Sequence, residues 1–540
     1  MFIPEDGEPQ RITAAQFYAS ALTFSTALSE IGIGPGDLVV LVLNHSRALL
    51  SAFWGAMLGG AIPSIFPFLT EKLDPDLYMQ RVRTLVEYEG AKAVITFPDF
   101  KESIASLLSG LDCRVLSLDD IPSSPAHLEL GTWNSELSLS DSVAFLQHSS
   151  GTTGLQKGVA LSHRSVLNQI DSYSRAINLT DTDVIASWLP LYHDMGLIAG
   201  FVMPISAGVP LVLMSPFHWV RSPKILLQAI HDTRATLCWL PNFAYNHCAL
   251  TIRQRDLEGL DLSSLRALIN CSEPVRHHSH QLFLEKFAPY GFRESALSAC
   301  YAMAENTFAV TQTPIGAPPR VEWININAYQ TDHVAKLAEP DSPGAMPFVS
   351  CGTAIDGAQV AIVDPAGKRL ADRRYGEIII RSDSMLSGYY KRPDLTAEAL
   401  LDGYFRTGDM GYLADGHLYL SGRHKDLIIV GGKNVYPQDL EAIANVIPGV
   451  YAGRAVAFGV DDDRLGTESV VLVCELAHDA SPDEHKAIAA DLRKRVVQQT
   501  EVTLADVRLV EKRWVIKTSS GKIARADNRD KYLRQFRSQA

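Results

Sequence analysis

The chain has 540 residues, a formal net charge of −12 and 46% hydrophobic residues, a composition typical of globular proteins rather than disordered or fibrous ones. Its length exceeds what one ordinary hydrophobic core accommodates, so at least two domains are expected. The mild acidity argues against a general nucleic-acid-binding protein. No apolar run approaches the roughly 20 residues that span a bilayer. The polar, acidic start MFIPEDGEPQ predicts no signal peptide.

The cysteines are widely spaced, and none form a CxxC pair. They are Cys113, Cys238, Cys248, Cys271, Cys300, Cys351 and Cys474. An odd, scattered set in a chain of this length predicts reduced thiols and a cytoplasmic location.

Helix-like and strand-like segments alternate through the first part of the chain. Apolar residues at helical spacing predict helices within 12–34 and 46–61, and uninterrupted apolar runs predict buried strands at 37–43 and 92–97. Further apolar runs continue the alternation at 183–190, 235–241 and 265–270. The pattern predicts α/β layers with largely parallel sheets.

The pattern of predicted elements changes after about residue 350, where short strands joined by turn residues are expected. They lie at 358–364, 376–381 and 417–423. A smaller α/β unit with helices at 437–447 and 483–499 follows. We therefore expect two domains, 1–424 and 425–540.

The last thirty residues, 511–540, hold nine Lys or Arg and three Asp or Glu. Such a stretch is either a solvated surface or a docking face for an acidic or phosphorylated partner. The sequence leaves both interpretations open.

A run of small residues, QHSSGTTGLQKG at 147–158, has the composition of an anion-binding loop. Backbone N–H groups and hydroxyls can approach a phosphate there, and Lys157 adds a positive charge. It is not a Walker P-loop, because Gly158 rather than Ser or Thr follows the lysine. This excludes a P-loop ATPase or kinase, although an ordinary surface turn remains an alternative. The apolar flanks predict a strand–loop–strand or strand–loop–helix setting.

Seven further motifs follow this loop in order. They are LPLYHDMG (189–196), NCSEPV (270–275), CYAMAEN (300–306), YFRTGD (404–409), GRHKD (422–426), GGKNVYPQD (431–439) and KTSSGKIAR (517–525). Together they resemble the adenylate-forming superfamily of acyl-CoA synthetases, peptide-synthetase adenylation domains and luciferases, over nearly the whole chain. Within it, PLYHDMGLI, LPNFAYNHC, NCSEPV and VYPQDLE are most similar to the fatty acyl-AMP ligases.

The resemblance implies a fold and a reaction. The fold is a large N-terminal domain of layered α/β subdomains with a β-rich segment, followed by a small mobile C-terminal α/β domain. A carboxylate attacks the α-phosphate of ATP to give acyl-AMP and pyrophosphate, with Mg²⁺ as cofactor, and a thiol then displaces AMP. The loop binds the β- and γ-phosphates through Lys157 and through Ser149, Ser150, Gly151, Thr152, Thr153 and Gly154. Gln156 stands where the family often has proline.

The resemblance also assigns nucleotide-binding residues. Glu305 would bind Mg²⁺, a hard cation that prefers carboxylate oxygens. Tyr301 would lie against adenine, unless it is an ordinary core tyrosine. Asp409 would accept from both ribose hydroxyls or else be a turn residue, and Arg423 would donate to the ribose or phosphate. The other side of the base would be lined by Ser272, Glu273 and Pro274.

Two residues are assigned to the chemical step. Lys522 would sit between carboxylate and α-phosphate and offset the charge that develops there; its alternative is a solvated lysine in a basic tail. His193 would guard the carboxylate pocket. The neighbouring Asp194 also invites a hydrolase interpretation, but no GxSxG elbow supports a nucleophilic triad.

Domain rotation is implied at the junction. Lys425 would be the hinge, and the Gly431-Gly432 loop would replace Lys522 and admit a pantetheine arm. Ordinary strand-end turns are the alternative for both.

Other residue groups are less specific. His277, His278 and His280 lack carboxylate or Cys neighbours at ligand spacing, so the surface of a helix is a better interpretation than a metal site. Trp239, Phe243, Tyr245 and the segment after Leu197 are either walls of an acyl pocket or core.

The acceptor thiol is expected on an acyl carrier protein rather than on free CoA. From Glu305 to Gly352 is 47 residues, a longer passage than in many CoA-using relatives. Fatty acyl-AMP ligases carry an extra segment here that hinders rotation into a CoA-productive pose, and the basic stretch 511–537 could attract an acidic carrier. Against this, GGKNVYP and FGVDDDRLGTE are similar to the CoA-using branch, and the segment could be a surface excursion.

Other function classes are a CoA ligase and a non-catalytic nucleotide-binding relative. A pure binder would not need Lys522 beside Glu305, Asp409 and Arg423, so an enzyme is expected. Nothing in the sequence requires luciferase-type oxidation.

Overall fold

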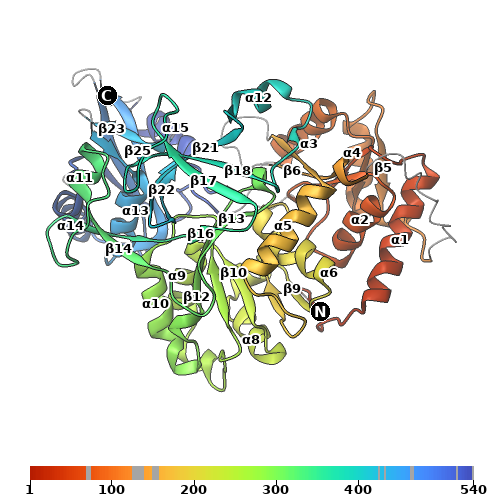
Figure 1. Cartoon of the computed structure of the whole chain (residues 1–540), viewed down its shortest axis with the longest axis horizontal. Coiled ribbons are helices and arrows are strands. Elements are labelled where there is room, and N and C mark those ends of the chain that lie inside the picture. Colours follow the sequence, from red (N-terminus) through yellow and green to blue (C-terminus); the bar gives the residue numbers. More distant parts are fainter. Residues whose placement is uncertain are drawn as a thin grey trace.

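The chain is described from a computed structural model that covers residues 1–5, 7–68, 75–124, 139–148, 157–423, 426–430, 433–462, 467–500, 502–518 and 521–537. Several residues of the sequence-based interpretation lie outside these ranges. They are Ser149, Ser150, Gly151, Thr152, Thr153, Gly154, Lys425, Gly431 and Gly432. Figure 1 shows helices α1 and α2 at one end of the molecule and the C-terminal unit at the other.

Two large sheets form the first part of the chain, and most of their strand pairs are parallel, as the buried apolar runs predicted. The seven-stranded sheet has the order β19-β7-β6-β3-β2-β4-β5. Its strands are β2 (Leu38–Leu41), β3 (Ile62–Ile65), β4 (Ala93–Thr96), β5 (Arg114–Ser117), β6 (Val143–His148), β7 (Gly158–Ser162) and β19 (Gly388–Tyr389). Strands β6 and β7 are antiparallel, so the predicted phosphate loop has a strand–loop–strand setting.

The second sheet has eight strands in the order β1-β9-β8-β10-β11-β12-β13-β16. They are β1 (Phe2–Ile3), β8 (Ile185–Ser187), β9 (Leu211–Met214), β10 (Leu237–Leu240), β11 (Ala267–Asn270), β12 (Leu297–Ala302), β13 (Ala309–Gln312) and β16 (Thr353–Ala354). Strands β8, β10, β11 and β12 are parallel neighbours. Their carboxyl ends lead into the segments that carry His193, Ser272 and Glu305.

Amphipathic helices cover these sheets (Figure 1). They are α1 (Ala14–Glu30), α2 (Arg47–Leu58), α3 (Pro75–Glu89), α4 (Pro98–Leu107), α5 (His163–Ala176), α6 (Met203–Ala207), α7 (Pro216–Arg221), α8 (Lys224–Thr233), α9 (Asn242–Thr251) and α10 (His277–Phe287). Local chemistry fixes where they begin. Thr13 and Gln16 form a capping box at α1, and the Ser46 and Ser162 hydroxyls accept backbone N–H groups at α2 and α5.

A β-rich segment follows, as the short strands expected after about residue 350 predicted. Its five-stranded sheet contains β17 (Ala358–Val363), β18 (Gly376–Ser382), β20 (Leu400–Leu401), β21 (Tyr404–Ala414) and β22 (His417–Arg423). A separate hairpin of β14 (Val321–Asn325) and β15 (Ala345–Val349) encloses α11 (Ile326–Thr331), and α12 (Pro393–Glu398) lies between β19 and β20.

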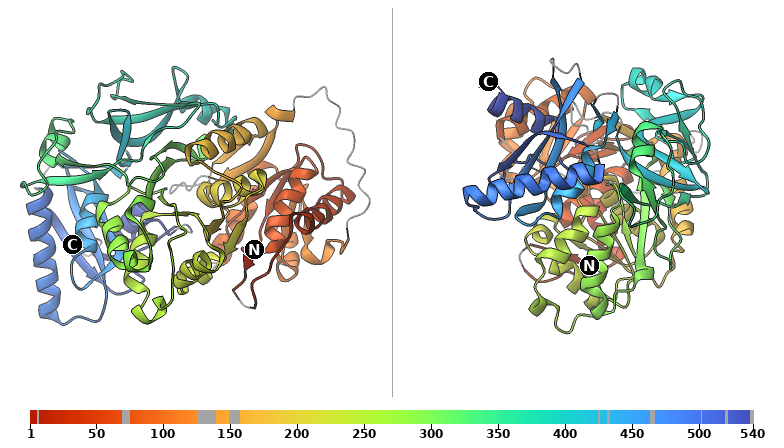
Figure 2. Two further views of the ribbon diagram at one scale, coloured as in Figure 1. Left: turned by 60° about the horizontal axis from the view of Figure 1, so that its bottom comes forward. Right: turned by 90° about the vertical axis from the view of Figure 1, so that its left-hand side faces the viewer.

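The C-terminal unit has a hydrophobic core of its own, formed by buried residues from Ile428 to Leu504. Its elements are β23 (Ile428–Val430), β24 (Lys433–Val435), α13 (Pro437–Asn445), β25 (Val450–Asp462), β26 (Thr467–Leu476), α14 (Pro482–Thr500), β27 (Leu504–Val510) and α15 (Arg525–Tyr532). Figure 2 shows the long helix α14 on the outside of this unit.

One buried arginine connects the beginning of this unit with its end. Arg525 donates to the carboxylates of Asp426, at 2.8 Å, and Glu441, at 2.6 Å, and to the carbonyl oxygen of Ala457 at 2.8 Å. Because Arg525 stands three residues after Lys522, this network fixes the base of the lysine loop on α13 and β25.

All seven cysteines are free thiols, and six of them are buried. Among the described residues, no helix is long and apolar enough to cross a membrane.

Candidate functional site

A single cleft of about 1920 Å³ lies where the two large sheets, the β-rich segment and the C-terminal unit meet. It is lined by Lys157, His193, Ser272, Glu273, Pro274, Tyr301, Glu305, Asp409, Arg423 and Lys522. These ten residues come from segments up to 365 positions apart, counted from Lys157 to Lys522, and each was expected at the nucleotide or carboxylate site. The structure therefore brings together every predicted site residue that it describes.

Asp409 is the centre of a charge cluster at one side of the cleft, in which Asp409 and Tyr301 are buried and Arg423 is exposed. The Tyr301 hydroxyl donates to its Oδ2 at 2.7 Å, and Arg423 Nε donates to its Oδ1 at 3.1 Å. Asp409 and Arg423 are opposite each other on the paired strands β21 and β22. The negative charges of Asp409 and Glu305 raise the pKa of Arg423, which therefore remains a cation. The pair offers an acceptor and a donor to a sugar or phosphate.

Glu305 lies in a second cluster with Tyr389 and Lys157. The Tyr389 hydroxyl donates to Glu305 Oε1 at 2.9 Å, and Lys157 Nζ lies 4.5 Å from the centre of the Tyr389 ring. Burial raises the pKa of Glu305, and the hydrogen bond from Tyr389 opposes this rise. A cation at this carboxylate would stabilise its charged form.

One end of the cleft is formed by His193 and Asp194, which precede the buried π-helical turn Met195–Val202. Burial and, to a smaller extent, the charge of Lys522 together lower the pKa of His193 to about 3. The ring is therefore neutral at pH 7. Burial raises the pKa of Asp194, while Lys522 opposes this shift. Lys522, His193 and Asp194 all line the same cleft.

The segment after β11 forms the opposite wall. Ser272 has a φ of +69°, a left-handed conformation uncommon for a residue with a side chain and most often found where function constrains the backbone. Glu273 Oε2 accepts the N–H of Phe243 at the start of α9, at 3.0 Å. Asn242 Oδ1 accepts the N–H of Arg276 at 3.0 Å. These two bonds hold the segment against α9.

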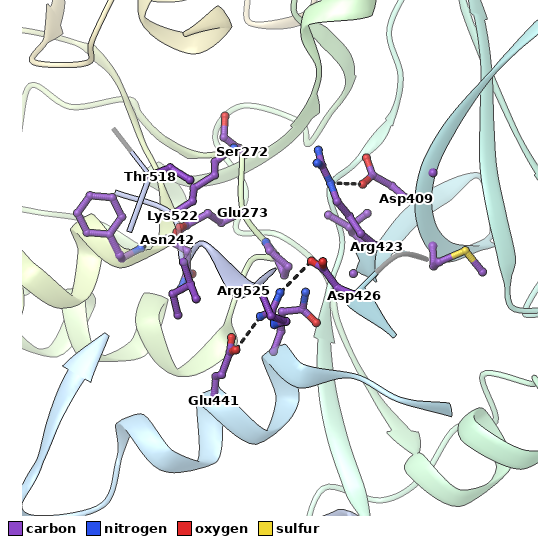
Figure 3. A pocket seen from close by; sticks show the side chains of 18 of the residues that line it. Asn242, Ser272, Glu273, Asp409, Arg423, Asp426, Glu441, Thr518, Lys522 and Arg525 are labelled. Carbon is purple, nitrogen blue, oxygen red and sulfur yellow. Dashed lines mark hydrogen bonds and ion pairs between the residues drawn. The ribbon is translucent and has the colours of Figure 1, made fainter. Parts of the chain in front are cut away.

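Lys522 enters the cleft from the C-terminal unit. Figure 3 shows it beside Ser272 and Glu273, with Asp409 and Arg423 across the pocket. The N–H of Thr518 donates to the Lys522 carbonyl at 2.7 Å, which closes a turn. Gly521 has a φ of +82°, and a Cβ placed there would lie 3.6 Å from the Phe243 ring, so the turn packs on α9.

A second contact between the units lies beside this turn. Arg276 Nη1 donates to Asp439 Oδ1 at 3.0 Å, joining the start of α10 to the first turn of α13. The Asp439 side chain is only 5% exposed, and burial raises its pKa while Arg276 opposes the rise. An ion pair so little hydrated depends strongly on its partner, so it favours one placement of the C-terminal unit.

Two sequence interpretations change in the structure. The three histidines lie on helix α10 as expected, but His280 is buried rather than at the surface, and its Nε2 lies 3.0 Å from Asn270 Nδ2. Trp239 and Tyr245 are fully buried core residues; of the three aromatic candidates for the acyl pocket, Phe243 is the one that lines the cleft.

The described residues contain no cluster of three or more His, Cys, Asp or Glu side chains that could hold a metal ion. Glu305 nevertheless suits Mg²⁺ when the other ligands are phosphate oxygens and water, because such sites use only one or two protein carboxylates. The residues present therefore fit a metal that arrives with a nucleotide.

The family model for the AMP-binding enzyme matches residues 2–390. The chain belongs to this family. The medium-chain fatty acid–[acyl-carrier-protein] ligase JamA of Moorena producens is 32% identical over 519 residues, covering 92% of this chain and 85% of the relative. The long-chain fatty acid–AMP ligase FadD32 of Mycolicibacterium smegmatis is 30% identical, covering 98% and 90%.

Solved structures agree. A structure from a study of fatty acyl-adenylate ligases of E. coli and L. pneumophila has a TM-score of 0.89 at 27% identity, covering 99% of this chain and 95% of its own. The L. pneumophila ligase in complex with acyl adenylate and pyrophosphate has a TM-score of 0.73 at 30% identity, covering 98% and 92%. This confirms the resemblance and the fold predicted from the motifs. The AMP-binding enzyme described here is an adenylate-forming ligase.

Sequence reasoning missed three residues that the geometry makes important. Tyr389 stands in the GYY stretch that follows β18, Arg276 directly follows the NCSEPV motif, and Asp439 is the last residue of the GGKNVYPQD motif. No chemical role was predicted for any of the three. Their positions within or next to predicted motifs were the signal in the sequence.

Lys522→Ala should lower acyl-AMP formation by about 10²-fold or more, because a preorganised charge at the reacting carboxylate is lost. Formation of thioester from supplied acyl-AMP should be largely spared. Separate assays of pyrophosphate release and of thioester formation check this. Equal losses in both steps would contradict the assignment.

Tyr389→Phe removes the hydroxyl that donates to Glu305 and keeps the ring beneath Lys157. We expect about a 10-fold loss of adenylation rate at limiting Mg²⁺, since a hydrogen bond to a charged group is removed. The loss should shrink as Mg²⁺ is raised. Tyr390→Phe is the matched control, and an equal effect in both variants would count against a specific role of Tyr389.

Proposed function

We propose that this enzyme uses ATP to activate a fatty or related carboxylic acid as acyl-AMP, releases pyrophosphate, and transfers the acyl group to the phosphopantetheine thiol of an acyl carrier protein. The observation that carries the proposal is the position of Lys522. It lines the same cleft as the half-buried His193 and Asp194, and the other walls of this cleft offer Asp409 and Arg423. The fatty acid ligases among its relatives support the substrate class.

In this proposal, different residues bind different parts of the nucleotide. Asp409 accepts from the ribose hydroxyls, and Arg423 donates to the ribose or phosphate. Tyr301 and the segment Ser272–Pro274 lie on the two sides of adenine. Lys157 meets the terminal phosphates together with the loop 149–154.

The carboxylate binds at the opposite end. His193 is neutral at pH 7, so it neither repels Lys522 nor competes for the substrate anion. The Lys522 ammonium draws the carboxylate and the α-phosphate together and offsets the negative charge that grows between them. Mg²⁺, held by Glu305, would neutralise charge on the phosphates.

The domain organisation is part of the same proposal. We place the units at 1–424 and 425–540, with Lys425 as the hinge and the Gly431-Gly432 loop as the later route for pantetheine. The separate C-terminal core and the interface at Arg276–Asp439 and Phe243–Gly521 support a unit that can move as a body. The free thiols support a cytoplasmic location.

The segment between β13 and β16 bears on which thiol accepts the acyl group. Tyr329 of α11 is fully buried, and its ring lies 5.0 Å from Phe348 and Tyr375 and 6.0 Å from Tyr436. Tyr436 belongs to the C-terminal unit and directly precedes α13. The segment is therefore packed against the small unit rather than extending into solvent.

This packing affects whether free CoA can serve as the acceptor. Rotating the C-terminal unit would pull Tyr436 out of a cluster with five other aromatic rings, Tyr329, Phe348, Tyr375, Tyr412 and Tyr419. Exposing such rings is costly. A carrier protein can offset this cost through its own contacts with the rotated unit, whereas free CoA offers a much smaller surface. The alternative is an acyl-CoA ligase, favoured by the sequence of the glycine loop.

The activity itself is tested by mass analysis of products from a panel of carboxylic acids with ATP and Mg²⁺. We expect acid-dependent pyrophosphate and acyl-AMP. Nucleotide binding without turnover on any acid would instead indicate a non-catalytic relative.

The acceptor is tested by kcat/KM with CoA and with a pantetheinylated carrier, using an acid that is adenylated. The carrier should be favoured by about 10-fold or more in the wild type, and Tyr329→Ala should raise turnover with CoA because the cluster is weakened. Tyr329→Phe keeps the packing and should behave as wild type. Efficient CoA turnover by the wild type, without advantage for any carrier, would refute the carrier and leave the adenylation chemistry standing.

A further inference from the structure

Three buried polar side chains are in contact with one another beside the hairpin formed by β6 and β7. Ser64 of β3 places Oγ 3.0 Å from Nδ1 of His148, the last residue of β6. Glu89, the last residue of α3, places its two carboxylate oxygens 3.0 and 3.1 Å from Nε2 of the same ring. The side chains of His148 and Glu89 are each 2% exposed. Both ring nitrogens are thus engaged within the protein.

The arrangement resembles a hydrolytic triad but cannot act as one. Ser64 is fully buried and is not among the described residues that line the cleft. A nucleophile must reach its substrate, and this hydroxyl does not. An ionised carboxylate only accepts hydrogen bonds, so Nε2 carries a proton and, in the neutral ring, Nδ1 accepts from Ser64. The set orients His148 and performs no chemistry.

Glu89 also contacts the second strand of the hairpin. His148 pairs with Gly158, the first residue of β7. A Cβ at Gly158 would lie 2.6 Å from Glu89 Oε1, which is closer than real Cβ contacts. The carboxylate therefore rests directly on the glycine backbone. This explains why glycine follows Lys157, a position where a phosphate loop of the Walker type has Ser or Thr.

The hairpin ends carry the lysine of the cleft. Lys157 immediately precedes Gly158 and lines the cleft, where its Nζ faces the Tyr389 ring. Tyr389 is on the neighbouring strand β19 and pairs with Val159 of β7. Any shift of the strand ends at His148 and Gly158 therefore moves Lys157 relative to Tyr389 and Glu305.

We propose that Glu89, His148 and Ser64 are positioning residues that fix the two ends of this hairpin and thereby set the affinity of the cleft for the β- and γ-phosphates of ATP. The proposal rests on the proposed function only in taking a triphosphate as the ligand. Their effect is on Lys157: Ser64 and Glu89 are not among the described residues that line the cleft, and His148, which does line it, has both ring nitrogens bonded within the protein.

The test compares ATP, with Mg²⁺, and AMP binding to the full chain by titration calorimetry, without acid or acceptor. Glu89→Ala and Gly158→Ala should each weaken ATP binding by about 10-fold or more, because a charged contact to phosphate is misplaced. AMP lacks the terminal phosphates, so its affinity should change less than about twofold. The double variant should be no weaker than the poorer single one, since both changes disrupt the same contact.

Two variants serve as controls. Glu89→Gln keeps an oxygen that accepts from Nε2 and should restore ATP binding to within about threefold of wild type. Gly34→Ala introduces a Cβ at a glycine with open space around it and should leave both affinities unchanged.

Parallel loss of ATP and AMP binding, or unchanged ATP binding in both single variants, would overturn the positioning role. Because only binding is measured, a wild type that binds ATP but adenylates no acid would refute the proposed function and leave this inference intact.

Discussion

The cleft depends on one contact: the C-terminal unit places the ammonium group of Lys522 in a cleft whose other walls are built by the rest of the chain. Lys522 is delivered by a turn whose base is fixed by Arg525 and whose tip packs on Phe243. The ion pair of Arg276, at the start of α10, with Asp439 of α13 holds the same unit at a second point. If the unit were displaced, the cleft would keep Asp409 and Arg423 and lose the charge of Lys522.

Two carboxylates of the cleft have partners within the protein. The buried Asp409 accepts from Tyr301 and pairs with the exposed Arg423, and Glu305 accepts from Tyr389. An ion pair with one exposed partner contributes little net stability. The arrangement therefore serves to define positions rather than to strengthen the fold. It leaves the cleft with fixed donors and acceptors before any substrate binds.

The sequence predicted the layered α/β fold because apolar periodicity reports burial directly, and the buried strand at 37–43 and the helix within 46–61 were found where expected. The site residues were predicted because each belongs to a motif with its own chemistry. What the sequence did not predict are contacts between segments far apart. Tyr329 packs on Tyr436, and Glu89 reaches Gly158, through the fold alone. The burial of His280 was missed because a histidine on a helix gives no sign of which face is covered.

The central claim is that the contact between the units holds Lys522 in place for adenylation. The most direct measurement is acid-dependent exchange of pyrophosphate into ATP by Asp439→Asn, compared with its transfer of supplied acyl-AMP to a carrier thiol. The account predicts that exchange falls by about 10-fold or more, because the Arg276 ion pair is lost, while transfer is retained. Unchanged exchange, or an equal fall in both activities, would contradict it.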